Sequence, residues 1–378
     1  MNITLVISSL SSGGAERVMS TMANYWTEKG WKITMITLDS TASDFYELHH
    51  NVKRIALGLM HDSNNPLVAI RNNIIRLIKL RSSIKLSKPD IVISFVDRMN
   101  IMTLLASRGL GFKVIISERT DPAYHNCGRI WSLLRNLTYP WADAIVVQSN
   151  KVRQWIEKIV KKGTTLVIPN PISNVNGKTN LEHSDTAFRG NTKSKQIIIA
   201  MGRLSAEKGF DLLLNAFAKT IHFHPNWCLI IFGDGKDRDT LIQLVNDLGI
   251  AELVSLPGRV NNPMQFLRQA EMFVLSSRYE GFPNALLEAM ACGLPVVSFD
   301  CPSGPREIIR DGIDGLLVPP EDVNALAAAM NQLMTDEALR KHLTARAPEV
   351  LERFGVEKVM GMWEKLLTES DYRLYKRR

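Results

Sequence analysis

The sequence lacks the features of several common protein classes. Its four cysteines (Cys127, Cys228, Cys292 and Cys301) show neither C-x-x-C nor histidine-paired spacing. This argues against a disulfide scaffold and a zinc site, and indicates free thiols in a reducing compartment. No apolar run approaches the ~20 residues of a membrane span, and a first strand expected from Ile3 leaves no room for a signal peptide. We therefore expect a cytoplasmic location.

Three nucleotide-binding and catalytic motifs are also missing. The sequence contains no G-x-G-x-x-G, no P-loop and no G-x-S-x-G. The loop "SSLSSGGAER" does place Gly13 and Gly14 between an expected strand and helix, where glycine lets the backbone approach a phosphate. A plain tight turn explains such a pair equally well. Because only Asp39 lies near the end of the second strand, a dinucleotide oxidoreductase is disfavoured.

The chain has 378 residues, of which 45% are apolar, enough for about two domains. Short apolar runs such as "DIVISFV" and "WCLIIFGDG" alternate with helical patterns, which predicts parallel sheets with crossover helices. The polar stretch 173–196 separates two such series. We expect an α/β protein with two doubly wound, Rossmann-like domains facing a cleft, residues 1–180 and 181–359. We expect the C-terminal helix, about 360–378, to pack back on the first domain.

Two basic residues occupy one expected strand-to-helix loop of the second half. In "GRLSAEKGF", Arg203 follows the strand and Lys208 precedes the helix. Two cations on such a loop can clamp a diphosphate. The alternative is a pair of solvated loop charges.

Two glutamates flank the start of an apolar helix in "EGFPNALLEAMACGLPVV". Glu280 precedes a Gly-Phe-Pro turn, and Glu288 lies inside a helix expected from Asn284 to Cys292. Backbone N–H groups at a helix start attract anions. Carboxylates beside them suit a ligand that carries hydroxyls as well as phosphates, such as a nucleotide-sugar.

The segment "KDRD" resembles a D-x-D metal motif. However, Asp237 and Asp239 directly precede the expected helix "TLIQLVNDLG", where aspartates commonly act as caps. We therefore expect no essential metal and no cofactor.

Residues 70–90 predict an amphipathic helix. One face carries Ile70, Ile74, Leu77 and Ile78, and Arg71, Arg76 and Lys79 lie on the flank or opposite. Either the apolar face packs on the sheet, or the helix lies on an anionic membrane surface. The net charge of +8 and the pI near 9.3 suit anionic partners. Basic residues are not interleaved with aromatics on one strip, so nucleic acid is disfavoured.

These motifs together resemble one family. Gly13–Gly14, "GRL…EKG", "GDG" at 233–235, "PGRV" at 257–260 and the Glu280/Glu288 segment are similar to the retaining glycosyltransferases of family 4, which have the GT-B fold. The resemblance covers almost the whole chain.

The resemblance implies roles for individual residues. Glu280 would bind sugar hydroxyls near the reacting carbon, Glu288 the ribose, and Arg203 and Lys208 the diphosphate; Glu280, Arg203 and Lys208 are the expected catalytic residues. The full expected set for the sugar donor is Gly13, Gly14, Arg203, Lys208, Gly233, Arg259, Glu280, Gly281, Phe282, Pro283, Asn284, Ala285 and Glu288.

The sequence departs from the family on the acceptor side. "VIISERTDPAYH" has Arg119 where many relatives carry a histidine. His125 could take that place, Arg119 suits an acceptor pyrophosphate, and Glu118 is either functional or structural. We expect Glu118, Arg119, His125, Arg71, Arg76 and Lys79 on the acceptor side.

Chains with this opening and a 70–90 segment resemble enzymes that extend lipid-linked oligosaccharides for O-antigen, capsule or N-glycan assembly. The expected activity is transfer of a hexose or N-acetylhexosamine from a UDP-sugar to a polyprenyl-diphosphate-linked glycan, by an enzyme peripheral on the inner face of the membrane. A family 4 transferase with a soluble acceptor is one alternative. A GT-B sugar-nucleotide epimerase is another, disfavoured by the two glutamates and the "EKG" loop.

Overall fold

The computed structural model describes residues 1–61, 65–125, 127–161, 163–173, 196–260 and 262–368. Two compact units form, Met1–Asn170 with Val359–Arg378, and Pro171–Lys358. The predicted domain boundary at 180/181 and nearly all of the predicted linker lie outside the described residues, as does the chain after residue 368.

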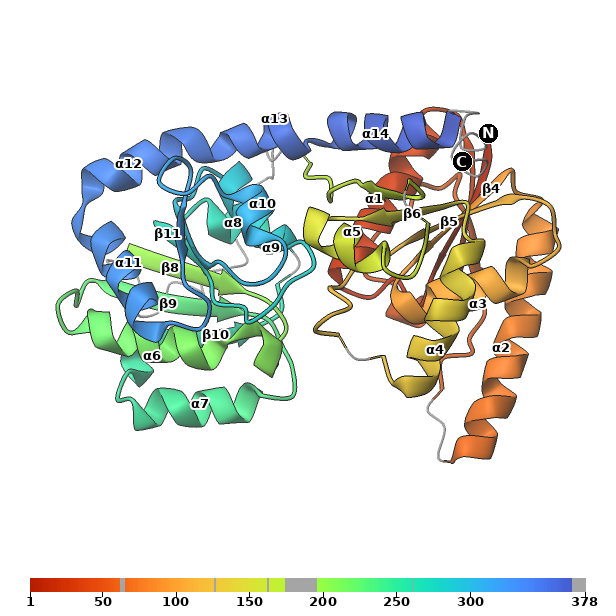
Figure 1. Ribbon diagram of the computed structural model, residues 1–378. Helices are drawn as coiled ribbons and strands as arrows, with labels where there is room; N and C mark the ends of the chain where they lie inside the picture. Colours follow the sequence, from red (N-terminus) through yellow and green to blue (C-terminus); the bar gives the residue numbers. More distant parts are fainter. Residues whose placement is uncertain (62–64, 126, 162, 174–195, 261, 369–378) are drawn as a thin grey trace. The chain divides into compact units, whose positions relative to one another are not determined.

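The first unit contains a seven-stranded parallel sheet in the order β3-β2-β1-β4-β5-β6-β7 (Figure 1). Its strands are β1 (Asn2–Ile7), β2 (Lys32–Thr37), β3 (Lys53–Ala56), β4 (Ile91–Phe95), β5 (Lys113–Ser117), β6 (Ala144–Val147) and β7 (Thr165–Val167). The order reverses between β1 and β4, and in open α/β sheets ligands bind at such a reversal, beyond the carboxyl ends of the strands.

Helices connect these strands. They are α1 (Gly14–Glu28), α2 (Pro66–Ser87), α3 (Asp97–Ser107), α4 (Arg129–Thr138) and α5 (Asn150–Ile156). Helix α2 begins with strong local signals, because the Asn65 side chain accepts a hydrogen bond from the Val68 N–H at 2.8 Å and Pro66 follows at the first position.

The first unit also includes the later part of α14 (Val356–Thr368). Within this unit, the Lys29 ammonium pairs with the Glu364 carboxylate at 2.9 Å. The rings of Trp363 and Phe95 lie 6.2 Å apart, and both side chains are fully buried.

The second unit contains a six-stranded parallel sheet in the order β10-β9-β8-β11-β12-β13. Its strands are β8 (Gln196–Met201), β9 (Trp227–Phe232), β10 (Val254–Gly258), β11 (Met272–Leu275), β12 (Val296–Phe299) and β13 (Leu316–Val318). Here the order reverses between β8 and β11.

The helices of the second unit cover both faces of its sheet (Figure 1). They are α6 (Phe210–Ile221), α7 (Arg238–Asp247), α8 (Pro263–Leu267), α9 (Asn284–Ala291), α10 (Pro305–Ile308), α11 (Val323–Thr335), α12 (Glu337–Arg346), α13 (Val350–Phe354) and the start of α14. A short 3-10 turn, Ala206–Lys208, precedes α6.

Continuous apolar sequences explain the central strands. "IVISF" in β4 and "WCLIIF" in β9 are buried at every position, as expected where helices cover both faces of a parallel sheet. In the second unit the two faces of the sheet form separate apolar clusters, one centred on α6 and α11 and the other on α9. The predicted α/β class, with two Rossmann-like parallel sheets, is confirmed.

Glycines bring the loops after β8 and β9 into backbone contact. A Cβ on Gly233 would lie 1.8 Å from the carbonyl oxygen of Gly202, and one on Gly235 would lie 2.2 Å from that of Leu204. Gly233 also has a φ of +140°, which other residues rarely adopt. Glycine is therefore required at both positions for the close approach of the two backbones, and at position 233 also for the turn.

Candidate functional site

A partly buried ion pair lies at the reversal of strand order in the second unit. The Lys208 ammonium, on the loop after β8, donates to Glu280 Oε1, on the loop after β11, at 2.6 Å. The Ser277 hydroxyl donates to the same oxygen at 2.6 Å. The Glu280 side chain is 9% exposed and that of Lys208 23%. Two predicted site residues that are far apart in sequence are thus in direct contact.

The two loops are joined at further points. A Cβ on Gly209 would lie 2.0 Å from the carbonyl oxygen of Ser276. The Arg278 guanidinium donates to both oxygens of Asp211, at 2.9 and 2.7 Å, and to the Ala206 carbonyl at 2.6 Å. These contacts fix the position of the Lys208–Glu280 pair.

Sequence reasoning missed the supporting residues Ser277, Arg278 and Asp211. Serine three residues before a glutamate, and a basic residue two residues before it, are too common to be a signal. They gain meaning only once the loops after β8 and β11 are known to be neighbours.

The apolar helix begins one residue after the Gly-Phe-Pro turn, as expected. Helix α9 runs from Asn284 to Ala291, one residue shorter than predicted, and Pro283 at its N-cap makes no side-chain capping bond. A Cβ on Gly304 would lie 2.7 Å from Pro283 Cδ, so the loop after β12 supports this turn. Glu288 is buried at 3% exposure, in the second turn of the helix rather than at its end.

The remaining predicted residues of this unit lie at carboxyl ends of neighbouring strands. Arg203 follows β8 and is exposed, and its side chain makes no ion pair within the described part of the chain. Arg259 follows β10 and is also exposed. Gly281 and Ala285 flank the α9 turn. An exposed arginine on the same loop as Lys208 is compatible with binding a diphosphate.

A thiol also lies close to Glu280. Cys301, just after β12, is 3% exposed. Burial raises the pKa of this thiol to about 12, with a further contribution from the Glu280 carboxylate. The thiol therefore stays protonated at neutral pH and is a poor nucleophile.

The prediction that the aspartates of "KDRD" cap a helix is correct for the position of Asp237 but wrong for its side-chain hydrogen bond. Asp237 does occupy the N-cap of α7, but its side chain makes no capping hydrogen bond. Its ψ of 9° departs from the extended backbone of a capping residue. Asp239 lies in the first helical turn, where a carboxylate is favoured by the helix dipole. Over the described residues, no group of three or more His, Cys, Asp or Glu is arranged to hold a metal ion.

In the first unit, the glycine loop is occupied by a carboxylate of the chain itself. Gly13 is the N-cap of α1, and Glu16 lies in its first turn. A Cβ on Gly13 would lie 2.1 Å from Glu16 Oε2. Because these atoms belong to the end of a flexible side chain that can move aside, the contact does not itself require glycine at position 13. The pair Gly13–Gly14 does not by itself indicate a phosphate site.

Glu118 follows β5 and is completely buried. The Tyr139 hydroxyl donates to its Oε2 at 2.7 Å, and the Thr120 hydroxyl donates to its Oε1 at 3.3 Å. Burial raises the pKa of the Glu118 carboxyl to about 7, although these hydrogen bonds lower it. The enclosure favours the structural interpretation of Glu118 over acceptor binding.

Arg119 is turned inward. Its Cζ lies 3.5 Å from the centre of the Phe95 ring, and its Nη1 donates to Asn170 Oδ1 at 2.6 Å. Its Nε and Nη2 are enclosed and, among the described residues, have no hydrogen-bond partner. Burial lowers the pKa of this guanidinium. In this conformation Arg119 does not present its charge to a pyrophosphate, unlike the sequence-based expectation.

His125 remains accessible. Its imidazole Nε2 lies 3.6 Å from Asp97 Oδ2, and the side chain is 46% exposed.

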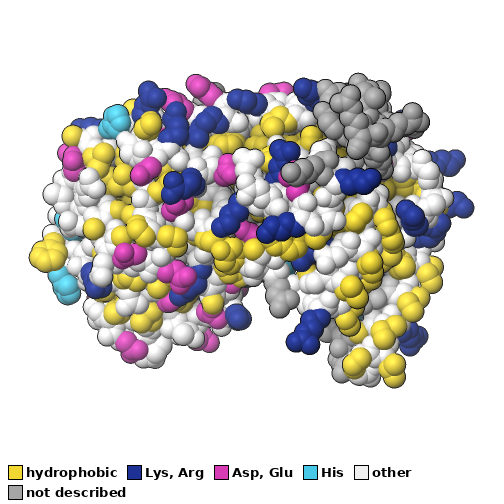
Figure 2. All heavy atoms as spheres, in the orientation of Figure 1, with side chains coloured by type: hydrophobic (Ala, Val, Ile, Leu, Met, Phe, Trp, Pro, Cys, Tyr) yellow, Lys and Arg dark blue, Asp and Glu magenta, His cyan; other side chains and the backbone are white. Residues whose placement is uncertain are grey.

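Helix α2 exposes the apolar face that could have packed on the sheet. Ile70, Ile74 and Ile78 are 58%, 52% and 59% exposed, and Figure 2 shows hydrophobic side chains along this helix. Of the four residues predicted on this face, only Leu77 packs against the apolar core of the first unit, so the packed-helix interpretation does not hold for the three isoleucines. Arg71 and Lys79 are exposed as well.

Arg76 differs from its two basic neighbours. Its guanidinium donates to the carbonyl oxygens of Leu59 at 2.9 Å and His61 at 2.8 Å. Arg76 thus anchors the loop before α2, while its expected place on the acceptor side stays a prediction.

Sequence reasoning missed a second exposed apolar stripe, on α4. Ile130, Leu133 and Leu137 are 74%, 60% and 55% exposed. Their i, i+3, i+7 spacing is readable in the sequence, but it does not say whether the face is covered. Helices α2 and α4 both contact α3, and neither contains an aspartate or glutamate.

Comparison with known proteins identifies the chain. Residues 12–174 match the family "Glycosyltransferase Family 4", and residues 184–350 match "Glycosyl transferases group 1". It is 32% identical over 371 residues to GalNAc-alpha-(1->4)-GalNAc-alpha-(1->3)-diNAcBac-PP-undecaprenol alpha-1,4-N-acetyl-D-galactosaminyltransferase of Campylobacter jejuni, covering 98% of this chain and 99% of the relative. The chain belongs to glycosyltransferase family 4.

Other similarities agree with this. The amylovoran biosynthesis glycosyltransferase AmsD of Erwinia amylovora is 26% identical, covering 94% of this chain and 96% of AmsD. Among solved structures, Anabaena HepE in complex with UDP and glucose has a TM-score of 0.80 at 20% identity, covering 97% of this chain and 99% of HepE. Sucrose-phosphate synthase of Thermosynechococcus elongatus also has a TM-score of 0.80 at 20% identity, covering 97% and 98%. The fold of the glycosyltransferase is GT-B.

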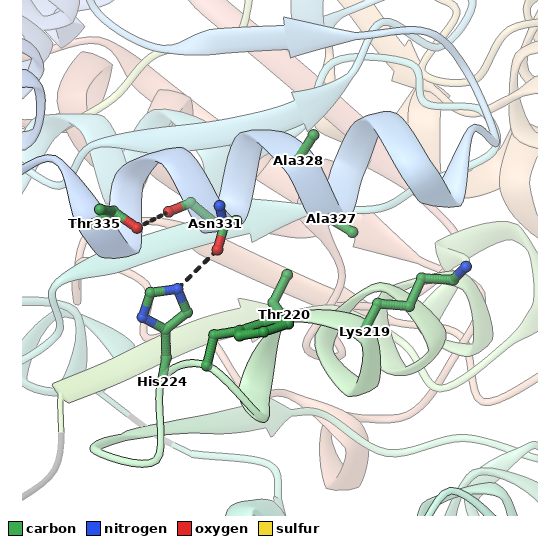
Figure 3. Close-up of a pocket in the computed structure, with 8 residues that line it drawn as sticks. Lys219, Thr220, His224, Ala327, Ala328, Asn331 and Thr335 are labelled. Atoms are coloured by element: carbon green, nitrogen blue, oxygen red, sulfur yellow. Dashed lines mark hydrogen bonds between the residues drawn. The ribbon is translucent and has the colours of Figure 1, made fainter.

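Two further features concern the surface of the glycosyltransferase. A groove of about 510 Å³ lies between the end of α6 and α11, beside the hydrogen bond of 2.8 Å between His224 and Asn331 (Figure 3). It lies at the far end of α6 from Lys208, about 18 Å along a 12-residue helix, and is separate from the ion pair.

None of the helices in the described ranges has the length and apolarity to cross a bilayer.

Glu118 makes the stability of the glycosyltransferase depend on pH. Its pKa is raised in the folded state, because the protonated carboxyl is favoured there. The protein therefore has its full stability below about pH 4.5, and loses part of it as pH rises through about 7 and the buried carboxyl ionises. A rise from 4.5 to about 7 corresponds to roughly 3 kcal/mol. We predict that Glu118→Gln, which can still accept from Tyr139, is more stable than wild type at pH 8.5 but not at pH 4.5.

Urea unfolding at both pH values measures this difference. The exposed Glu252→Gln is the matched control and should change neither value. Equal effects of Glu118→Gln at both pH values would contradict the prediction.

Proposed function

We propose that the enzyme transfers a hexose or N-acetylhexosamine from a UDP-sugar, with retention of configuration, to a glycan linked to polyprenyl diphosphate at the inner face of the cell membrane. The observation that carries the proposal is the partly buried Lys208–Glu280 pair at the reversal of strand order, 2.6 Å apart. It offers a cation and a carboxylate at the point where a doubly wound sheet binds its ligand.

The two charges suit different parts of a sugar nucleotide. Lys208, with the exposed Arg203, would stabilise negative charge that builds on the leaving diphosphate, usually the largest catalytic contribution. Glu280 would accept hydrogen bonds from hydroxyls of the transferred sugar, and Glu288 those of the ribose. The first-turn N–H groups of α9 would meet the sugar or phosphate. HepE, which shares the fold, is known in complex with UDP and glucose.

The acceptor class is supported by a relative and by a surface. The printed name of the Campylobacter relative includes a glycan on PP-undecaprenol. The exposed stripes of α2 and α4 lie on helices that carry Arg71, Lys79 and Arg129 and no acidic residue. Apolar side chains beside basic ones suit an anionic bilayer surface, where such an acceptor resides.

The direct test is transfer itself. The enzyme is incubated with a polyprenyl-diphosphate-linked N-acetylhexosamine oligosaccharide and a panel of UDP- and GDP-sugars, and the product is analysed by mass spectrometry. We expect a mass increase of one or more sugars with a UDP-sugar. Conversion of the sugar nucleotide without any acceptor would instead indicate an epimerase, and product formed only with GDP-sugars would overturn the choice of donor.

Substitutions of the ion pair test the site. We predict that Lys208→Met and Glu280→Gln each lower kcat/KM at least ~100-fold, because a lost contact to transition-state charge is worth roughly 2.7–4 kcal/mol. Glu280→Gln should act mainly on kcat, and Glu288→Gln mainly on the KM of the sugar donor. Steady-state kinetics at fixed acceptor measures both.

The double variant Lys208→Met/Glu280→Gln distinguishes binding from structure. If the pair only stabilises the fold, removing both charges should restore activity; if both residues bind the sugar donor, activity stays low. The exposed pair Lys341–Glu337, 2.6 Å apart, provides a control double variant that should remain active. Recovery in the Lys208/Glu280 double variant would remove these residues from the site.

The membrane surface is tested with vesicles. We predict that Arg71→Gln/Lys79→Gln weakens binding to phosphatidylglycerol-containing vesicles by about 1 kcal/mol per charge, and that Ile130→Ser/Leu133→Ser/Leu137→Ser also weakens it. These side chains are exposed, so folding should be preserved. Co-sedimentation measures the affinity.

Two variants serve as controls. Phe223→Ser changes a residue of the second unit that is 77% exposed and should bind vesicles normally. Arg76→Gln should lower thermal stability, because it frees the Leu59 and His61 carbonyls. Unchanged vesicle binding by the α2 and α4 variants would favour a soluble acceptor.

A further inference from the structure

A buried carboxylate marks the reversal of strand order in the first unit. Asp97 follows β4 as the first residue of α3, and its side chain is 5% exposed. Its Oδ1 accepts the Arg98 N–H at 2.6 Å. Its Oδ2 is enclosed and, over the described ranges, accepts no hydrogen bond. An ionised oxygen so placed is costly unless a partner reaches it.

The backbone before Asp97 is strained. Val96 has a φ of +75°, which is exceptional for a β-branched residue. Its N–H donates to the Ser117 carbonyl at 3.2 Å, and its own carbonyl accepts from the Asn100 N–H at 2.8 Å. Strain of this kind persists where the surroundings fix it and is concentrated at functional sites. Here it sets the direction in which Asp97 leaves the strand.

His125 approaches Asp97 from the next strand. Asp121 shapes the loop after β5. Its Oδ1 accepts a hydrogen bond from the Ala123 N–H, and its backbone carbonyl accepts from the N–H groups of Tyr124 and His125. This turn brings His125 Nε2 to 3.6 Å from Asp97 Oδ2. That distance exceeds a hydrogen bond, but catalytic contacts are often long without substrate and tighten in the complex.

One nitrogen of the imidazole thus faces a buried carboxylate, while the His125 side chain as a whole is about half exposed. A carboxylate favours a proton on the nitrogen that faces it, and this leaves the other nitrogen unprotonated. Nε2–H would then be directed at Asp97, and Nδ1 would be a hydrogen-bond acceptor. Two charged groups lie nearby. Arg98 donates to the Cys127 carbonyl at 3.4 Å. The pKa of Glu118 is raised mainly by burial and further by the charge of Asp97.

We propose that His125 Nδ1 accepts a hydrogen bond from a hydroxyl of the acceptor glycan and that Asp97 is the positioning residue that holds the imidazole for this contact. The ligand is a hydroxyl rather than a phosphate, because the Asp97 carboxylate 3.6 Å from the ring repels an anion. This assignment rests on the proposed function for the nature of the acceptor, while the tautomer of His125 does not depend on it.

The tautomer is tested on the free enzyme by long-range ¹H–¹⁵N correlation of the imidazole nitrogens. His125→Gln identifies the signals by their loss. We expect wild-type His125 at pH 8 to carry its proton on Nε2, and Asp97→Asn to shift the population toward Nδ1–H. A wild-type Nδ1–H tautomer, or spectra unaffected by Asp97→Asn, would overturn the assignment even if no acceptor has been found.

Kinetics test the contact with substrate. With the polyprenyl-diphosphate-linked oligosaccharide as acceptor, we expect His125→Ala and Asp97→Asn to raise the acceptor KM about 10-fold, the effect of one lost hydrogen bond. His125→Gln should recover part of it, since an amide oxygen can also accept.

Folding and specificity are controlled separately. His125 is 46% exposed, so its variants should fold even if Asp97→Asn does not. The exposed His342→Ala, on α12 of the second unit, is the matched control and should behave as wild type. An unchanged acceptor KM in His125→Ala would overturn the proposal, whereas a wild type that transfers no sugar to this acceptor would refute the proposed function instead.

Discussion

The second unit depends on one partly buried ion pair. Lys208 and Glu280 belong to the loops after β8 and β11, the two strands between which the sheet changes direction. A carboxylate that is 9% exposed needs its partner, since an unpaired buried charge is strongly destabilising. The pair therefore fixes the relative position of two loops that come from distant parts of the sequence. The same contact sets a cation beside a carboxylate at the reversal of strand order.

Close backbone packing is the second constraint, and it changes the meaning of the glycines. Gly209 and Gly233 each leave no room for a Cβ, which would lie 2.0 and 1.8 Å from a carbonyl oxygen. Each of these glycines lies in a motif that also resembles a ligand-binding loop. The packing requirement alone would keep them, so glycine-rich motifs in this fold indicate loop architecture first and ligand contact only with further support.

Much of the fold was predictable from the sequence because the central strands are continuous apolar runs. Strands β3 and β7 were missed, since one is a partly exposed edge strand and the other has three residues. In the candidate site, the sequence identified Lys208 and Glu280 singly but not their contact, which follows from strand order. It could not show that Arg76 is used by loop carbonyls or that Asp97 is enclosed, because both depend on tertiary neighbours rather than on local pattern.

The ambiguity of α2 illustrates the same limit. Periodicity showed an apolar stripe with basic residues beside it, which fits both a packed helix and a surface helix. The structure divides the stripe, because Ile70, Ile74 and Ile78 are each more than half exposed while Leu77 packs against the core. Contiguous exposed apolar side chains favour association and are uncommon on monomeric proteins unless they bind something. A partner that covers this stripe must tolerate its basic flank and the absence of any acidic residue on α2. An anionic lipid surface meets both conditions, whereas a basic partner does not.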